Sequence, residues 1–271
     1  MKVYCILGDE RALRSKSPAL FSAILKRLGI RGGYVPFMVA PENLGQALQS
    51  LRVLNIAGAN VTVPYKETCL PCLDALSEGA EIIGAINTIV CKDGQLKGYN
   101  TNAIGIMDAL STAGFKVEGT SALVIGTGGA AKAAVFILNW LRTQVVYVCG
   151  RSPAKTLEMA KRFHSEALSF ERLSEAPFPV DILVNATAVS SPDESPKMAA
   201  WVQQLKLPHC RLVLDLNYGR QKNFWQAMAE AQGIRFMDGL GVLAAQARRT
   251  FALWTGIQVP PEEFVSVLKE I

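Results

Sequence analysis

The chain has 271 residues, of which half are apolar, with 22 glycines and 13 prolines. This composition is typical of a globular protein with one large or two modest cores, and two domains are the better interpretation. Lysine and arginine outnumber aspartate and glutamate by 28 to 23. The excess is too scattered for a nucleic-acid surface, although it suits an anionic small molecule. An ordinary solvated surface is the favoured interpretation of this charge.

The N-terminal stretch and the cysteines bear on location and on metals. The first ten residues hold one basic residue before a short apolar run, too short for a signal peptide or a membrane span, so we expect a cytoplasmic protein with no membrane partner. Six irregularly spaced cysteines fit reduced thiols. Cys69 and Cys72 form a C-x-x-C in an expected helix, and packing thiols are favoured over a redox or zinc pair. With only His164 and His209, a multi-histidine metal site is excluded and no metal is expected.

Apolar runs of strand length alternate with amphipathic stretches of helix length, a pattern typical of an α/β protein with parallel sheets. In the first third, strands are expected at 3–7, 34–39, 58–63 and 87–91. Ser17 and Pro18 indicate an N-cap followed by proline at the first helical position, and Pro41-Glu42 repeats this start signal. Asp93-Gly94 predicts a tight hairpin turn, so this sheet should contain an antiparallel pair.

A second series of strands is expected at 121–126, 145–150, 181–186 and 211–216. These runs are apolar throughout instead of alternating, as expected when helices cover both faces of a parallel sheet. Residues 240–256 carry apolar positions at helical spacing and predict a long helix. A final helix is expected after Pro260-Pro261.

Between the strand at 121 and the following helix lies the sequence GTGGAAKA. Gly126, Gly128 and Ala131 have the G-x-G-x-x-A spacing. In this motif the first glycine allows a tight turn, the second lets the backbone approach a pyrophosphate, and the third small residue permits close packing of helix and strand. Gly129 and Ala130 then open a helix whose unpaired N–H groups face an anion. This context predicts a dinucleotide-binding site.

The end of the next strand indicates which dinucleotide binds. An NAD site would place an acid there for the ribose hydroxyls, whereas the chain has Gly150-Arg151-Ser152 and then Lys155. Arg151, Ser152 and Lys155 can hold a 2′-phosphate through charge-assisted hydrogen bonds. A solvated helix start is the alternative, but basic residues oppose the helix dipole there unless an anion is present. NADP is therefore favoured over NAD.

Several short segments offer small neutral polar groups around one cation. Ser15 and Ser17 suit a carboxylate beside a helix start, while Asn60 and Thr62 precede Lys66, which can act as a general acid or base. Further amides occur in AINT at 85–88 and in the Asn100-Thr101-Asn102 run. Each segment alone fits a cap or a turn. Together they favour a polyhydroxylated carboxylic acid over a phosphate ester.

These motifs together resemble the shikimate dehydrogenase family and its quinate-using relatives. The resemblance runs along the chain through SKSP at 15–18, NVTVPYK at 60–66, AINT at 85–88, GYNT at 98–101, GTGGAAKA at 126–133, NAT at 185–187, DLNY at 215–218, and DGLG with AAQA at 238–247. It implies an α/β fold with two domains. A substrate-binding and catalytic domain with a mixed sheet would comprise 1–103 and 239–271, and a Rossmann-type doubly wound NADP-binding domain would comprise 104–238.

The resemblance also implies roles. The serines matching Ser15 and Ser17 bind the substrate carboxylate, and Lys66 exchanges the hydroxyl proton while a hydride moves to or from the nicotinamide, near Gly239. The remaining residues line the pocket: Asn60, Thr62, Asn87, Tyr218 and Gln246. The implied activity is the NADP-dependent interconversion of 3-dehydroshikimate and shikimate, or of quinate or a close hydroxy-carboxylic acid. This reaction belongs to the chorismate route to aromatic amino acids. We expect the protein to be a monomer or a homodimer.

The chain departs from the family pattern in three places. Asn102 stands where the family has a catalytic aspartate, Val189-Ser190 occurs in the stretch where the family usually has N-A-T-x-x-G-M, and GRQKN at 219–223 lacks the usual proline and threonine. One change alone would fit a laboratory substitution that silences an enzyme, whereas three together favour a divergent branch. The last two also fit neutral loop drift.

Loss of the carboxylate at position 102 should lower the pKa of Lys66 relative to the usual pair. The amide of Asn102 can still hold a substrate hydroxyl, so slow turnover is expected. Three hypotheses follow: this dehydrogenase, a dehydrogenase of a different cyclic polyol acid, or a non-catalytic protein that binds NADP or another ligand.

Overall fold

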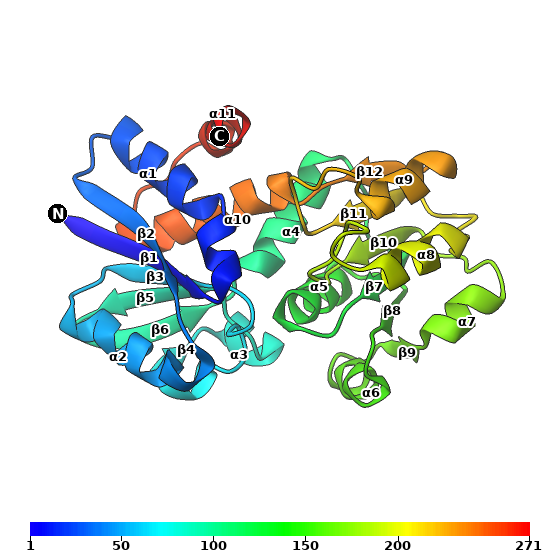
Figure 1. Cartoon of the computed structure of the whole chain (residues 1–271), viewed down its shortest axis with the longest axis horizontal. Coiled ribbons are helices and arrows are strands. Elements are labelled where there is room, and N and C mark those ends of the chain that lie inside the picture. Colours follow the sequence, from blue (N-terminus) through cyan, green and yellow to red (C-terminus); the bar gives the residue numbers. More distant parts are fainter. The chain divides into compact units, whose positions relative to one another are not determined.

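The computed structural model describes all 271 residues and divides them into two units. The first unit comprises residues 1–105 and 243–271, and the second comprises 106–242. Each contains one six-stranded sheet with helices against it (Figure 1). The boundaries fall inside two helices, α4 (Thr101–Thr112) and α10 (Leu240–Thr255).

The sheet of the first unit is mixed, with strand order β2-β1-β3-β5-β6-β4. Its strands are β1 (Lys2–Gly8), β2 (Gly32–Met38), β3 (Gly58–Val61), β4 (Ala75–Leu76), β5 (Thr88–Lys92) and β6 (Gln95–Tyr99). Strand β1 pairs in parallel with β2 and β3, whereas β5 runs antiparallel to β3 and β6. The other complete helices of this unit are α1 (Ser17–Arg27), α2 (Leu44–Val53), α3 (Glu78–Ile83) and α11 (Pro261–Glu270).

The predicted hairpin between β5 and β6 is confirmed. Lys92 pairs with Gln95, and Asp93 and Gly94 between them have φ of 51° and 74°. Both lie in the left-handed region that a type I′ turn requires, which Asp and Gly tolerate better than other residues. The turn therefore sets the antiparallel part of this sheet.

Two local predictions in this unit are wrong. Ser17 is the first residue of α1 instead of its N-cap, because the hydroxyl of Ser15 already accepts the Ser17 N–H over 3.1 Å. The C-x-x-C segment forms a turn and a short 3₁₀ helix, Leu70–Cys72, in place of an α-helix. Pro71 lacks the N–H that a continuing α-helix would need. The Pro41 start signal begins another 3₁₀ helix, Pro41–Asn43, and α2 follows directly at Leu44.

The sheet of the second unit is wholly parallel, with strand order β12-β11-β10-β7-β8-β9. Its strands are β7 (Ser121–Ile125), β8 (Val145–Cys149), β9 (Glu166–Leu168), β10 (Ile182–Asn185), β11 (Leu212–Asp215) and β12 (Arg235–Met237). The helices are α5 (Gly129–Trp140), α6 (Pro153–Arg162), α7 (Phe170–Glu175), α8 (Pro196–Gln204) and α9 (Phe224–Ala231). This order is the doubly wound one, in which ligands bind beyond the carboxyl ends of the two strands where the order reverses, here β7 and β10.

The predicted α/β fold with a mixed and a doubly wound parallel sheet is therefore confirmed. Strands β10 and β11 are buried along their whole length, which explains their unbroken apolar sequences.

No helix of either unit is both long and apolar enough to span a membrane.

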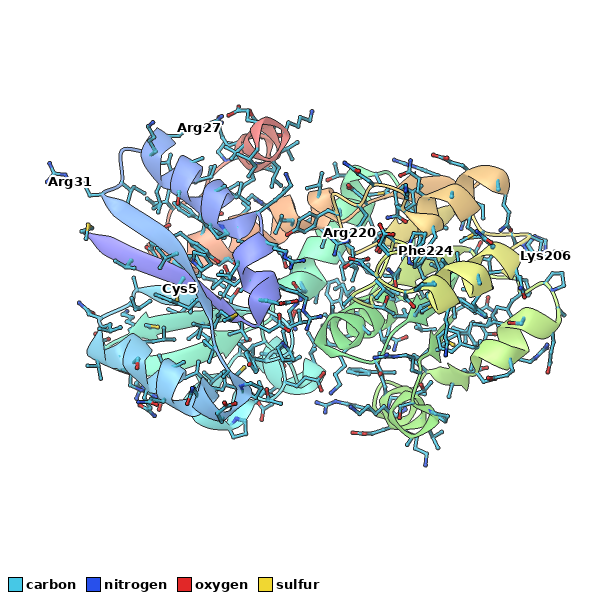
Figure 2. All side chains as sticks on the ribbon, in the orientation of Figure 1. Cys5, Arg27, Arg31, Lys206, Arg220 and Phe224 are labelled. Atoms are coloured by element: carbon cyan, nitrogen blue, oxygen red, sulfur yellow. The ribbon has the colours of Figure 1, made fainter.

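Two ion pairs and a buried apolar face hold the C-terminal helix α11 against the rest of the first unit. Arg27 of α1, labelled in Figure 2, contacts Glu263 over 2.9 Å and Glu270 over 2.6 Å. Phe264 and Val267 of α11 are fully buried. Because the ion pairs are exposed, the buried side chains supply most of the stabilisation.

Trp254 of α10 is the centre of an aromatic cluster in the first unit. Its indole stacks on Tyr4 with ring centroids 4.7 Å apart, and its Nε1 donates to the carbonyl of Ile89 in β5 over 2.9 Å. The backbone of Gly58 in β3 lies directly against this indole, so a Cβ at position 58 would overlap the ring. Gly58 is therefore required for packing.

We expect Gly58→Ala to lower the free energy of unfolding by about 1–3 kcal/mol, because the added methyl group overpacks the Trp254 contact. Gly45→Ala in α2 is the matched control: its Cβ would meet no atom within 4 Å, so it should gain up to about 1 kcal/mol in helix propensity. Urea unfolding of both variants measures the difference. A Gly58→Ala protein as stable as the parent would contradict this account of the core.

Candidate active site

A buried network of neutral side chains surrounds Asn87, the residue before β5. Its Oδ1 accepts the backbone N–H of Thr101, the first residue of α4, over 2.7 Å. Its Nδ2 donates to Asn102 Oδ1 over 2.9 Å and to Gln246 Oε1 of α10 over 3.1 Å. Three residues predicted for the site, Asn87, Asn102 and Gln246, are thus brought together from three segments of the chain.

Two threonines behind these amides were missed by sequence reasoning. Thr88 and Thr250 are fully buried, and their hydroxyls lie 2.9 Å apart. Thr101 Oγ1 also contacts Thr250 Oγ1 over 3.1 Å. One signal was available: Thr250 follows Gln246 by four residues, so both lie on one face of α10. The hydroxyls satisfy one another's hydrogen bonds, as buried polar groups must.

The side chain of Asn60, near the end of β3, is hydrogen-bonded to the residues around Asn87. Its Nδ2 donates to the Asn87 carbonyl over 2.9 Å and to Thr88 Oγ1 over 3.2 Å, and its Oδ1 accepts the hydroxyl of Tyr34 over 2.8 Å. Thr62 lies two residues further on, outside the strand and half-buried. Tyr34 was not predicted from the sequence.

Lys66 lies in the turn that follows β3, next to this network. Its carbonyl accepts the N–H of Ile86 over 2.8 Å, which places Lys66 beside the residue that precedes Asn87. Burial lowers the pKa of the Lys66 ammonium to about 8, and no charged neighbour contributes to the shift. A lysine with this pKa can both hold and release a proton near neutral pH.

The two predicted serines lie before α1 and are not hydrogen-bonded to the Asn87 network. Ser15 is half-buried and Ser17 is buried. Because Ser15 Oγ accepts the Ser17 N–H, its hydroxyl proton remains available for an acceptor such as a carboxylate. Lys16 between them donates to the carbonyl of Ile271 over 2.7 Å, so its cation is directed to the chain's last residue.

In the second unit, the glycine loop follows β7 as the sequence predicts. Gly126 has φ of 125°, and a Cβ there would approach the Ala186 carbonyl group to 3.0 Å. Gly128 precedes α5 without a side-chain cap, and Gly129 is the buried first helical residue. Ala130 is half-buried at the same helix start. The first turn of α5 therefore has uncapped N–H groups that fit the pyrophosphate of a dinucleotide.

Arg151, Ser152 and Lys155 follow β8 at the start of α6. Ser152 Oγ accepts the Lys155 N–H over 3.4 Å and caps the helix, while Arg151 and Lys155 are exposed. The first turn of α6 contains no acid. The two exposed cations beside a helix N-terminus fit a phosphate group. A Cβ on Gly150 would collide with Thr127 of the glycine loop, so the two loops are in contact.

The loops after β10 and β11 are joined by the buried carboxylate of Asp215. Its two oxygens accept from Asn185 Nδ2 over 2.8 Å and from Asn223 Nδ2 over 2.7 Å. Burial raises the pKa of Asp215, although these hydrogen bonds act in the opposite direction. Ser190 is also fully buried, and its Oγ accepts from Asn217 Nδ2 over 2.8 Å. The serine at this departure from the family pattern is therefore a buried, hydrogen-bonded part of the loop.

An ion pair links the same two loops at the third departure, residues 219–223. Arg220, labelled in Figure 2, contacts Glu194 over 2.7 Å, and the other oxygen of Glu194 accepts the Ser190 N–H over 2.7 Å. Tyr218 is half-buried before Arg220. Gly239 donates its N–H to the Asn217 carbonyl over 2.9 Å, and a Cβ there would overlap the Leu216 carbonyl oxygen.

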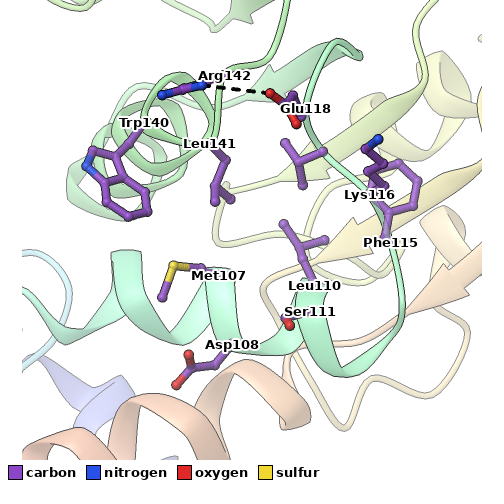
Figure 3. Close-up of a pocket in the computed structure, with 11 residues that line it drawn as sticks. Met107, Asp108, Leu110, Ser111, Phe115, Lys116, Glu118, Trp140, Leu141 and Arg142 are labelled. Carbon is purple, nitrogen blue, oxygen red and sulfur yellow. Dashed lines mark ion pairs between the residues drawn. The ribbon is translucent and has the colours of Figure 1, made fainter.

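A separate hollow of about 740 Å³ lies at the far end of α5 (Figure 3). Trp140, Leu141 and Arg142 form one side of it, and Met107 and Leu110 of α4 form the other. Helix α5 has 12 residues, so this hollow is roughly 17 Å from the glycine loop along the helix axis. It contains none of the predicted site residues.

The doubly wound sheet with its glycine loop, and the lysine beside a polar network in the other unit, define an NADP-dependent oxidoreductase. Two family models match the chain: "Shikimate dehydrogenase substrate binding domain" over residues 7–89 and "Shikimate / quinate 5-dehydrogenase" over 109–236. Together they cover most of the sequence. The chain belongs to the shikimate dehydrogenase family.

Individual relatives agree with this assignment. The chain is 38% identical to a shikimate dehydrogenase (NADP(+)) of Citrifermentans bemidjiense, over 92% of this chain and 88% of the relative. It is 36% identical to the enzyme of the same name from Thermococcus kodakarensis, over 97% and 93%. A crystal structure of shikimate 5-dehydrogenase from Thermus thermophilus, in complex with NADP(H) and shikimate, superposes with a TM-score of 0.86 at 33% identity, covering 100% of this chain and 99% of that one.

Proposed function

We propose that this protein catalyses the NADP-dependent interconversion of 3-dehydroshikimate and shikimate, with Lys66 as the acid and base. The observation that carries the proposal is a lysine whose pKa is lowered by burial and which contacts the residue before Asn87, whose amide in turn holds Asn102 and Gln246. Membership of the family and the Thermus thermophilus complex with NADP(H) and shikimate support the choice of substrate and cofactor. The reaction would act in the chorismate route to aromatic amino acids.

We assign substrate binding to the first unit. Ser15 and Ser17 would bind the carboxylate, since two hydroxyls near a helix start provide donors for an anion. Asn87, Thr62 and Gln246 would contact the ring hydroxyls. Asn60 has both amide atoms engaged by protein groups, so we assign it to positioning Asn87.

The second unit would bind NADP, and its residues fit that group. The uncapped start of α5 at Gly128, Gly129 and Ala130 would hold the pyrophosphate. Gly126 and Gly150 lie where a Cβ would crowd Ala186 and Thr127, so they let the loops around the glycine motif pack closely together. When bound, the cofactor supplies or accepts the hydride. We also assign Tyr218 to substrate binding and Gly239 to contact with the nicotinamide.

Lys66 would supply the proton that the reaction requires. In the reducing direction its ammonium donates a proton to the oxygen of the ring ketone, and in the oxidising direction its neutral amine removes the hydroxyl proton. With Asn102 in place of aspartate, the second group at this position orients the substrate and does not share the proton. The proposal therefore includes a rate below that of a lysine and aspartate pair.

The proposal extends to the setting of the enzyme. The six cysteines are all unpaired, and burial raises the pKa of Cys5, Cys69 and Cys149 to about 12. Thiols of this kind fit the reducing cytoplasm. We propose a cytoplasmic monomer or homodimer that acts on a small hydroxy-carboxylic acid and has no nucleic-acid or membrane partner.

Lys66→Met should lower kcat for NADPH-dependent reduction of 3-dehydroshikimate by about 10²- to 10⁴-fold, because it removes the proton donor. Asn102→Asp should raise kcat of the parent protein. NADPH oxidation, with quinate and shikimate oxidation in parallel, measures both. Full activity of Lys66→Met would contradict the mechanism. NADP binding without turnover in every variant would instead favour the non-catalytic hypothesis.

The pH dependence of kcat/KM in the two directions is a second test of Lys66 as the acid and base. Since Lys66 has a pKa of about 8, kcat/KM should fall above pH 8 for reduction, which needs the ammonium, and rise through pH 8 for oxidation, which needs the amine. Asn102→Asp should move both midpoints to higher pH, because a carboxylate stabilises the charged lysine.

Arg151→Ala should weaken NADP binding about 10- to 100-fold and leave NAD binding nearly unchanged, because it removes charge-assisted hydrogen bonds to the 2′-phosphate. Lys161→Ala is the matched control, since Lys161 is an exposed cation in the last turn of the same helix. Calorimetric titration with both dinucleotides measures the effect. Equal loss of NADP and NAD affinity in Arg151→Ala would remove the assigned role.

A further inference from the structure

The orientation of the Asn87 carboxamide is fixed by a backbone group. The N–H of Thr101 can only donate, so the Asn87 atom that it contacts over 2.7 Å must be the oxygen. The other branch of the carboxamide is therefore the NH₂ group, which can only donate. The two N–H groups of Asn87 face three acceptors, Thr101 Oγ1 and Asn102 Oδ1 at 2.9 Å and Gln246 Oε1 at 3.1 Å.

The donors of Asn87 fix the orientation of Asn102 in turn. The Asn102 atom 2.9 Å from Asn87 Nδ2 must be an acceptor, which is Oδ1. The same reasoning applies to Gln246, whose Oε1 faces Asn87 Nδ2 over 3.1 Å. In both residues the oxygen is turned toward Asn87 and the NH₂ group is on the branch that remains.

The Asn102 NH₂ group is open to a ligand. Asn102 is 6% exposed, and its Nδ2 makes no hydrogen bond with the protein. The side-chain atoms that are fully buried without a hydrogen-bond partner do not include Asn102 Nδ2. This nitrogen is therefore partly exposed. A donor that is neither paired nor sealed needs a partner from outside the protein.

We propose that Asn102 is a specificity-determining residue that presents a hydrogen-bond donor to the reacting region, so that the site favours the ring ketone over the ring alcohol. Gln246 likewise turns its NH₂ group away from Asn87, and Lys66 contacts Ile86, the residue before Asn87, through its backbone carbonyl. A ketone oxygen accepts from an N–H donor and carries no proton of its own. An alcohol at the same place needs an acceptor for its hydroxyl proton, which an aspartate at position 102 would supply and the amide nitrogen does not. This inference rests on the proposed function, because it concerns the same reacting oxygen.

The test compares the affinities of the two ring acids in complexes that cannot react: 3-dehydroshikimate with NADP⁺ and shikimate with NADPH. Titration calorimetry at pH 7 gives the ratio of the two dissociation constants. Asn102→Asp should shift this ratio toward shikimate by about 3- to 10-fold, the worth of one hydrogen bond gained or lost. Asn102→Ala, which removes both amide atoms, should give an intermediate ratio.

Asn55→Asp is the matched control, because it makes the same chemical change at an exposed turn residue of the same unit. It should leave the ratio unchanged. Binding of both acids with the same ratio in the parent and Asn102→Asp would overturn the orientation while leaving the proposed function intact. Failure of both acids to bind the parent and both position-102 variants would contradict the proposed function and this inference with it.

Discussion

The hydrogen bond from the Thr101 N–H to Asn87 Oδ1 is the contact on which the substrate unit depends most. It joins the start of α4 to the residue before β5 over 2.7 Å, and it determines which side of the Asn87 carboxamide faces Asn102 and Gln246. A backbone N–H cannot reverse its role as a side-chain amide can. The polarity of the site is therefore set by the main chain, and the amides around it follow.

The cofactor unit depends on a different constraint, the close approach of loops at the carboxyl ends of the strands. Gly126, Gly150 and Gly239 each lie where a Cβ would crowd or overlap a neighbouring group. Asp215 then joins the loops after β10 and β11 through buried hydrogen bonds. Main-chain spacing thus decides the shape of the nucleotide loop, whereas oriented side chains decide the chemistry at Asn102.

The sequence was sufficient where a pattern extends over several residues. The long apolar strands, the Asp93-Gly94 hairpin and the G-x-G-x-x-A loop all have signals of this kind, and all were predicted. The outer strands β4, β9 and β12 have two or three residues, too few to form a pattern. Thr88 and Thr250 were missed because they meet across 162 residues of sequence. The orientation of Asn102 required the position of the Thr101 N–H, which no sequence motif supplies.

The central claim is that position 102 presents a donor, and neutron diffraction from deuterium-exchanged crystals tests it most directly. Deuterons locate amide nitrogens without reference to the hydrogen-bond pattern, so the two branches of each carboxamide can be told apart. Deuterons on the Asn87 branch that faces Asn102, together with two more on the Asn102 branch that faces away from Asn87, are the predicted result. An Asn102 oxygen on that outer branch would contradict the account.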